Sequence, residues 1–74
     1  MEQLLEYENL VYSIINKYSG YDKDDLYQAG IMGLIQAYKN YDSSFNVKFS
    51  SYAYYYILGE VTKYINIEKH LFHY

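Results

Sequence analysis

Segment 49–65 constrains the fold most strongly, because it carries five tyrosines and must also supply a helix's share of the core. At about 100° per residue, its positions divide into two arcs of a helix. One arc is an ordinary core-facing stripe, made of Ala53, Tyr54, Ile57, Val61, Tyr64 and Ile65. The other arc is mainly aromatic and holds Tyr52, Tyr55, Tyr56, Gly59 and Lys63. The segment therefore predicts an amphipathic helix with an aromatic outer face.

The aromatic arc of this segment suits the binding of unstacked nucleic-acid bases. Bases stack on aromatic rings with about 1–3 kcal/mol each, and a lysine such as Lys63 can meet a phosphate. Gly59 leaves room on the same arc because it carries no side chain. A structural explanation stands beside this one, since tyrosines are amphipathic and occur at many surfaces. Periodicity alone favours the structural explanation.

Composition predicts an all-α fold in a single domain, residues 1–74. The chain has no Pro, four Gly and 51% hydrophobic residues at helical spacing, which a helical bundle can bury. It has no Cys, so it can form neither a disulfide nor a thiolate metal site. No apolar run reaches the roughly 18 residues of a membrane span, and the N-terminus lacks the basic start of a signal peptide. These features predict a soluble, cytoplasmic protein with no membrane partner.

The charge balance limits how the chain could engage nucleic acid. Six basic residues, all Lys, face nine acidic residues, so the net charge is −3. Such a domain cannot hold duplex DNA by phosphate neutralisation alone. Any role on nucleic acid would need a partner that supplies affinity.

The apolar spacing predicts three helices, at about 2–18, 22–39 and 50–70. Gly20 is suited to end the first helix in the left-handed conformation, and Asp22 can cap the second. Gly30 and Gly33 lie on the inner stripe of the second helix, where a glycine costs about 1 kcal/mol relative to Ala. Two such glycines predict close packing against a neighbouring helix.

The periodicity stops between residues 40 and 48, where Asp and Ser turn formers predict a loop. Ser50 or Ser51 is then predicted to cap the third helix.

Two motifs joined by this loop resemble region 2 of the bacterial sigma-70 family of RNA polymerase sigma factors. The first is Asp-Leu-Tyr-Gln-Ala-Gly at 25–30, followed by Gly33-Leu34. The second is Phe-Ser-Ser-Tyr-Ala at 49–53, followed by Gly-Glu-Val at 59–61. The resemblance extends from about residue 9 to 66 and implies a three-helix bundle. The Gly-Glu-Val sequence is more similar to alternative sigma factors than to housekeeping ones.

The resemblance implies that the second helix binds the clamp helices of the largest subunit of core RNA polymerase. The implied polymerase-binding residues are Asp25, Leu26, Gln28, Ile31 and Ile35. Asp25 would accept charge-assisted hydrogen bonds from a cationic partner, and Gln28 would add a neutral polar contact. Ala29 stands where the family often has Glu, so one carboxylate is missing. A structural alternative is that Asp25 only serves the helix dipole.

The resemblance also implies that the third helix recognises and melts the −10 element of a promoter. The implied DNA-binding residues are Lys48, Phe49, Ser51, Tyr52, Tyr55, Tyr56, Gly59 and Lys63. Tyr52 would stack on a base flipped from the non-template single strand, and stacking must offset the few kcal/mol that flipping costs. Tyr55 and Tyr56 would wedge the upstream edge of the bubble, and Lys48 and Lys63 would contact phosphates.

The sequence contains nothing similar to the helix-turn-helix region that reads the −35 element in this family. Two interpretations stay open: a fragment, or a small protein that works with a separate −35-reading partner. An anti-sigma factor is a further candidate partner. A second function also stays open, in which the chain is a polymerase- or regulator-binding domain, as a decoy or split-sigma subunit, without DNA binding of its own.

Other chemistry has little support in the sequence. Glu68, His70 and His73 form a weak candidate zinc set near the C-terminus. No Ser/His/Asp set, Gly-rich phosphate loop or recessed carboxylate pair is visible, so neither enzymatic activity nor a cofactor is expected.

Overall fold

The computed structural model describes residues 6–72, with the side chains of residues 6–67. Within this range the elements are α2 (Glu8–Ile15), α3 (Lys23–Asn40), the short 3-10 helix η1 (Ser43–Phe45) and α4 (Phe49–Phe72). The described residues contain three α-helices and no strand, which confirms the predicted all-α bundle. None of the described helices is long and apolar enough to cross a membrane.

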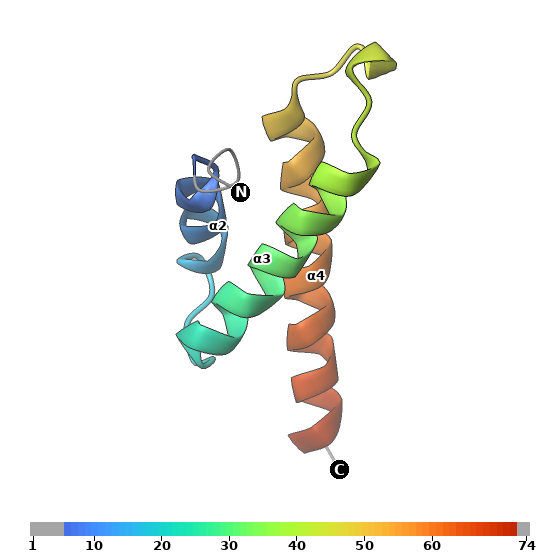
Figure 1. Cartoon of the computed structure of the whole chain (residues 1–74). Coiled ribbons are helices and arrows are strands. Elements are labelled where there is room, and N and C mark those ends of the chain that lie inside the picture. The colour runs from blue at the N-terminus through green and yellow to red at the C-terminus, as the bar shows by residue number, and fades with distance from the viewer. Residues whose placement is uncertain (1–5, 73–74) are drawn as a thin grey trace.

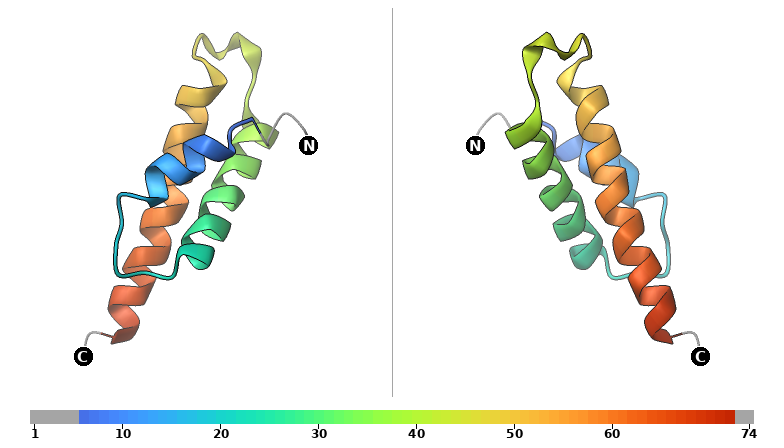
Figure 2. Two further views of the ribbon diagram at one scale, coloured as in Figure 1. Left: turned by 90° about the vertical axis from the view of Figure 1, so that its left-hand side faces the viewer. Right: turned by 90° about the vertical axis from the view of Figure 1, so that its right-hand side faces the viewer.

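Helices α3 and α4 run antiparallel and form the main packing pair (Figure 1). The connection that carries η1 closes one end of this pair, and α4 extends past α3 at the other end. Helix α2 lies across one side of the pair and contacts both helices (Figure 2). The molecule is therefore elongated, with extents of 46 × 19 × 18 Å.

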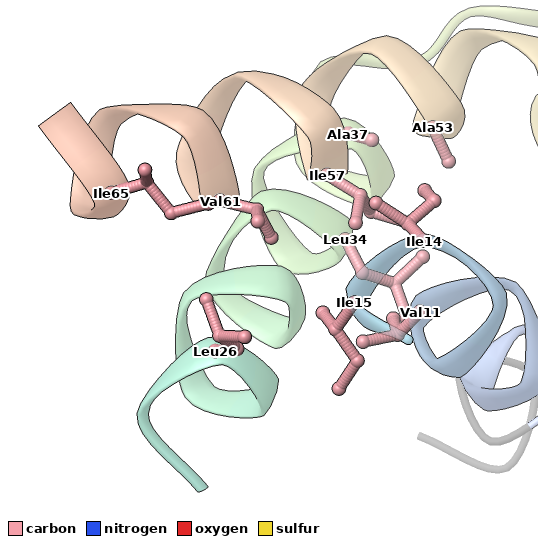
Figure 3. Close-up of a cluster of buried hydrophobic side chains, with 10 residues drawn as sticks. All are labelled: Val11, Ile14, Ile15, Leu26, Leu34, Ala37, Ala53, Ile57, Val61 and Ile65. Atoms are coloured by element: carbon pink, nitrogen blue, oxygen red, sulfur yellow. The ribbon is translucent and has the colours of Figure 1, made fainter. Parts of the chain in front are cut away.

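The core lies where the three helices meet (Figure 3). Its ten side chains are all apolar and each is at most 6% exposed. They are Val11, Ile14, Ile15, Leu26, Leu34, Ala37, Ala53, Ile57, Val61 and Ile65. The predicted inner stripe of α4 is confirmed at its four aliphatic positions, whereas Tyr54 and Tyr64 are half-buried at its margins.

Two glycines of α3 permit the close packing that the sequence predicts. A Cβ atom on Gly33 would lie 2.5 Å from the backbone oxygen of Tyr56 and 2.8 Å from the Cα atom of Ile57. A Cβ atom on Gly30 would lie 2.6 Å from the Val11 Cγ1 atom of α2. Real Cβ atoms do not approach other atoms this closely, so side chains at these positions would push the helices apart.

The start of α3 agrees with the predicted cap. The Asp22 carboxylate accepts hydrogen bonds from the backbone N–H groups of Asp24, at 2.9 Å, and Asp25, at 3.2 Å. Gly20 adopts φ 87°, in the left-handed region where glycine carries no steric penalty. The turn between α2 and α3 is thus fixed by the residues that the sequence singled out.

The first helix is shorter than predicted. The apolar spacing predicts residues 2–18, whereas α2 spans Glu8–Ile15. Beyond α2, the Tyr18 N–H donates to the carbonyl of Ile15, three residues earlier, at 3.0 Å. This bond has the spacing of a 3-10 turn, which is tighter than an α-helix. Tyr18 therefore packs against the core from a turn and not from the helix. Residues 2–5 lie outside the described residues.

The predicted cap of the third helix is wrong. Helix α4 begins at Phe49, and the Tyr52 N–H donates to the Lys48 carbonyl at 3.1 Å. Ser50 and Ser51 therefore lie inside the first turn. The preceding loop contains the short helix η1, whose Ser44 N–H donates to the Asp42 carboxylate at 2.9 Å. This bond lowers the pKa of the Asp42 carboxyl group.

We expect Gly33→Ala to lower the free energy of unfolding by about 1–3 kcal/mol, because the added methyl group overlaps the backbone of α4. Gly59→Ala is the matched control, since a Cβ atom there meets nothing within 4 Å. On α4 the same change should leave stability unchanged or raise it by up to about 1 kcal/mol. Urea denaturation followed by circular dichroism measures both, and equal stability of the two variants would contradict the packing described.

Candidate nucleic-acid and partner-binding faces

Five aromatic rings gather where η1 and the start of α4 meet. This tip cluster consists of Tyr41, Phe45, Phe49, Tyr52 and Tyr56. Tyr52 lies at its centre, with ring centroids 5.4 Å from Tyr41, 5.5 Å from Phe45 and 5.1 Å from Tyr56. Phe49 joins through Tyr41, edge to face at 5.3 Å. Tilted and edge-to-face pairs are favourable, so the rings support one another.

Hydrogen bonds fix the two tyrosines of α4 within the tip cluster. The hydroxyl oxygens of Tyr52 and Tyr56 lie 3.2 Å apart. Tyr52 also donates to the backbone oxygen of Asn40, and the Asn40 side-chain amide donates to Tyr56, both at 3.4 Å. The bond with Tyr56 raises the pKa of Tyr52. The end of α3 thereby holds both rings in place.

Tyr55 is not part of the tip cluster, although the helical wheel groups it with Tyr52 and Tyr56. Its side chain is 73% exposed, and its ring contacts Tyr54 edge to face at 5.6 Å. With Tyr56 and Gly59 it lines a shallow hollow of about 310 Å³. The predicted aromatic face is therefore a fixed pair of rings beside one exposed ring.

The remaining predicted DNA-binding residues are spread from just before the start of α4 to just past its midpoint. Lys48 and Ser51 are exposed next to the tip cluster. Ser51 lines a hollow of about 260 Å³ with Tyr54 and Tyr55. Lys63 lies about three turns further along α4 than Tyr52, in a groove with Asp25. The structure thus separates Lys63 from the rings with which the sequence grouped it.

An open groove of about 420 Å³ runs between the start of α3 and the second half of α4. This α3–α4 groove is lined by Asp25, Gln28, Ala29, Met32, Glu60, Lys63, Tyr64 and Ile67. The structure therefore brings together Asp25 and Gln28, the two polar residues predicted to bind a partner. The Tyr64 hydroxyl donates to the Asp25 carboxylate at 3.1 Å.

Leu26 lies in the core beneath the predicted polymerase-binding residues, and Met32 is a residue that the sequence analysis missed. Leu26 is 0% exposed in the core, so in this fold it has no surface to offer a partner. Ile31 and Ile35 are half-buried against the core. Met32 is 55% exposed in the α3–α4 groove, one turn from Gln28. Its i+4 spacing from Gln28 is the signal that could have identified it.

Sequence reasoning also missed a contact between α3 and α2. The Tyr27 hydroxyl donates to the Glu8 carboxylate, and the Tyr27 ring stacks on Tyr12 with centroids 5.3 Å apart. The hydrogen bond to Glu8, followed by desolvation, raises the pKa of Tyr27 to about 12. This contact steadies the helix that carries Asp25 and Gln28.

The described side chains contain no group of three His, Cys, Asp or Glu residues that could hold a metal ion. The predicted zinc candidates Glu68, His70 and His73 lie outside the described side chains.

The described helices form a small α-helical bundle with an aromatic tip at one end and the open α3–α4 groove towards the other. The family model described as Sigma-70 region 2 matches residues 4–69. The chain belongs to this family, as the two motifs predicted.

Relatives in the same family are alternative sigma factors. The chain is 47% identical over 58 residues to the RNA polymerase sigma-G factor of Clostridium acetobutylicum, covering 76% of this chain and 23% of that protein. It is 41% identical over 58 residues to the RNA polymerase sigma-F factor of Priestia megaterium, with the same coverage. It is 42% identical over 67 residues to the RNA polymerase sigma-B factor of Bacillus anthracis, covering 86% and 26%. The chain spans about a quarter of the length of these relatives. No solved structure matches it significantly.

We expect one tyrosine of the folded chain to ionise only at high pH, with a pKa of about 12. Tyr27→Phe should remove this late step from the titration of the tyrosines. Because this pKa lies above the ordinary value of 10.0, the Glu8 bond stabilises the fold fully below about pH 10. That stabilisation is lost as the pH rises through 12. At pH 8, Tyr27→Phe should therefore cost about 1 kcal/mol.

Tyrosinate absorbance, titrated in both proteins, measures the late step, and urea denaturation at pH 8 measures the cost. Tyr12→Phe is the control, since it keeps the stacked ring and the Glu8 bond. Identical titration curves for the parent chain and Tyr27→Phe would contradict the assignment.

Proposed function

We propose that the chain is a transcription-initiation module that binds core RNA polymerase through α3 and captures bases of the −10 non-template strand at its aromatic tip. The observation that carries this proposal is the separation of two faces on one closely packed helix pair. Asp25 lies in the first turn of α3 and Asn40 ends the helix, which at about 1.5 Å per residue sets them about 22 Å apart. One chain can therefore contact protein and nucleic acid at the same time.

The tip cluster supports base capture because its rings are already ordered. Tyr52 and Tyr56 are held by Asn40, so stacking a base on them costs little side-chain entropy. Tyr55 and Phe45 are exposed beside them and offer further ring surface. Each stacked base contributes about 1–3 kcal/mol, enough to offset the cost of flipping it from the duplex.

The charges of the chain indicate that the polymerase supplies most of the affinity for DNA. The net charge is −3. Of the two lysines predicted to contact phosphates, Lys48 lies next to the tip cluster and Lys63 does not. Few released counterions mean weak binding of free DNA. Asp25, Gln28 and Met32 offer a polymerase subunit a carboxylate, an amide and an apolar side chain on one helix.

A second candidate function is a polymerase- or regulator-binding domain that does not engage DNA. The observation that favours it is the acidic balance, with a net charge of −3. This candidate retains polymerase binding and lacks any dependence on the aromatic rings.

We expect Tyr52→Ala to weaken promoter opening by the polymerase complex about tenfold or more, because it removes a stacking platform. Polymerase binding should be unchanged in this variant. Asp25→Ala should weaken polymerase binding by about tenfold, since a charge-assisted hydrogen bond is lost. When enough of the Asp25→Ala variant is added to saturate the polymerase, promoter opening should return to the level of the parent chain.

Pull-down of core polymerase and permanganate footprinting of the open promoter measure these two steps. Tyr52→Phe is the matched control, because it keeps the ring and removes only the hydroxyl group. Equal loss of both activities in both alanine variants would overturn the proposal, and unchanged opening with Tyr52→Ala would favour the second candidate.

A further inference from the structure

Asp25 is held from two directions, because α3's own cap fixes its backbone and α4 holds its carboxylate. Its backbone N–H donates to Asp22 at 3.2 Å, which fixes the start of α3. Its side-chain Oδ2 atom accepts a hydrogen bond at 3.1 Å from the Tyr64 hydroxyl, 39 residues later in the chain. An exposed aspartate on a first turn ordinarily samples several rotamers, so this second bond needs a reason.

We infer that Tyr64 is a positioning residue for polymerase docking, because its hydroxyl holds the Asp25 carboxylate in the orientation that receives a cationic side chain of the polymerase. The inference rests on the proposed function, in which Asp25 binds polymerase. It adds a contribution from α4 to a contact that the motif assigns to α3 alone.

The chemistry of the α3–α4 groove agrees with this role. A carboxylate has about four lone-pair sites, so one bond from Tyr64 leaves capacity for a lysine or arginine of the partner. Met32 and Ile67 are each at least half exposed along the same groove and can pack on the aliphatic stem of such a side chain. The groove therefore fits a basic side chain that enters along an apolar wall.

Preorganisation explains why a neutral hydroxyl affects a charged contact. A side chain that is already ordered loses less entropy when the partner binds. Tyr64 is half-buried against the core, so its ring is anchored while its hydroxyl reaches the groove. The ring and the hydroxyl thus have separate roles, and Tyr64→Phe removes only the second.

The test is a double-mutant cycle on the whole chain, with affinity for core RNA polymerase as the readout. Tyr64→Phe should weaken binding about threefold to tenfold, the effect expected for releasing one side chain. Asp25→Asn should weaken it at least as much. In the Asp25→Asn background, Tyr64→Phe should change affinity by less than about twofold. Tyr12→Phe is the matched control, since it removes a tyrosine hydroxyl on α2, away from the groove.

Each outcome of the cycle decides the inference. If Asp25→Asn weakens binding and Tyr64→Phe does not, the positioning role is overturned while the proposed function stands. If Tyr64→Phe weakens binding equally in both backgrounds, Tyr64 acts without Asp25 and the inference is again overturned. If Asp25→Asn binds as tightly as the parent chain, docking at Asp25 fails and the inference fails with it. Thermal unfolding of each variant separates a loss of contact from a loss of fold.

Discussion

The approach of α3 to the backbone of α4 at Gly33 is the constraint on which the rest of the structure depends. The missing side chain lets the two helices lie almost in backbone contact near Tyr56 and Ile57. Because the pair is antiparallel, this closeness brings the two ends of α3 within hydrogen-bonding distance of α4. Asn40 meets Tyr52 and Tyr56 at one end, and Asp25 meets Tyr64 at the other. Both candidate binding faces are thus assembled by one packing contact.

Sequence periodicity predicted the parts of the fold that depend on local geometry. The inner stripe of α4, the Asp22 cap and the close packing at Gly30 and Gly33 all follow from spacing or backbone chemistry within one helix. Helix ends were less predictable, because the tight turn after α2 continues the apolar pattern as far as Tyr18. The caps at Ser50 and Ser51 failed because Lys48 supplies the first helical carbonyl.

The sequence identified most residues of the candidate faces, but it did not predict which of them contact one another. A helical wheel groups Tyr52, Tyr55 and Tyr56, yet contacts from Asn40 and Phe45 select two of them and leave Tyr55 outside. The wheel also places Lys63 with these rings, because a helical wheel does not show how far apart two residues lie along the helix axis. The bonds of Tyr27 to Glu8 and of Tyr64 to Asp25 join residues far apart in the chain. Such pairs depend on how the helices pack, which single-helix reasoning does not contain.

The most direct test of base capture uses a single-stranded −10-type oligonucleotide with 2-aminopurine in place of one adenine at a time. The probe is added to the complex of the chain with core polymerase, and its fluorescence is measured. Stacking on the tip cluster predicts that one labelled position is strongly quenched on binding, and that Tyr52→Ala restores its emission. An oligonucleotide that binds with no position quenched, or quenching that survives Tyr52→Ala, would contradict the account.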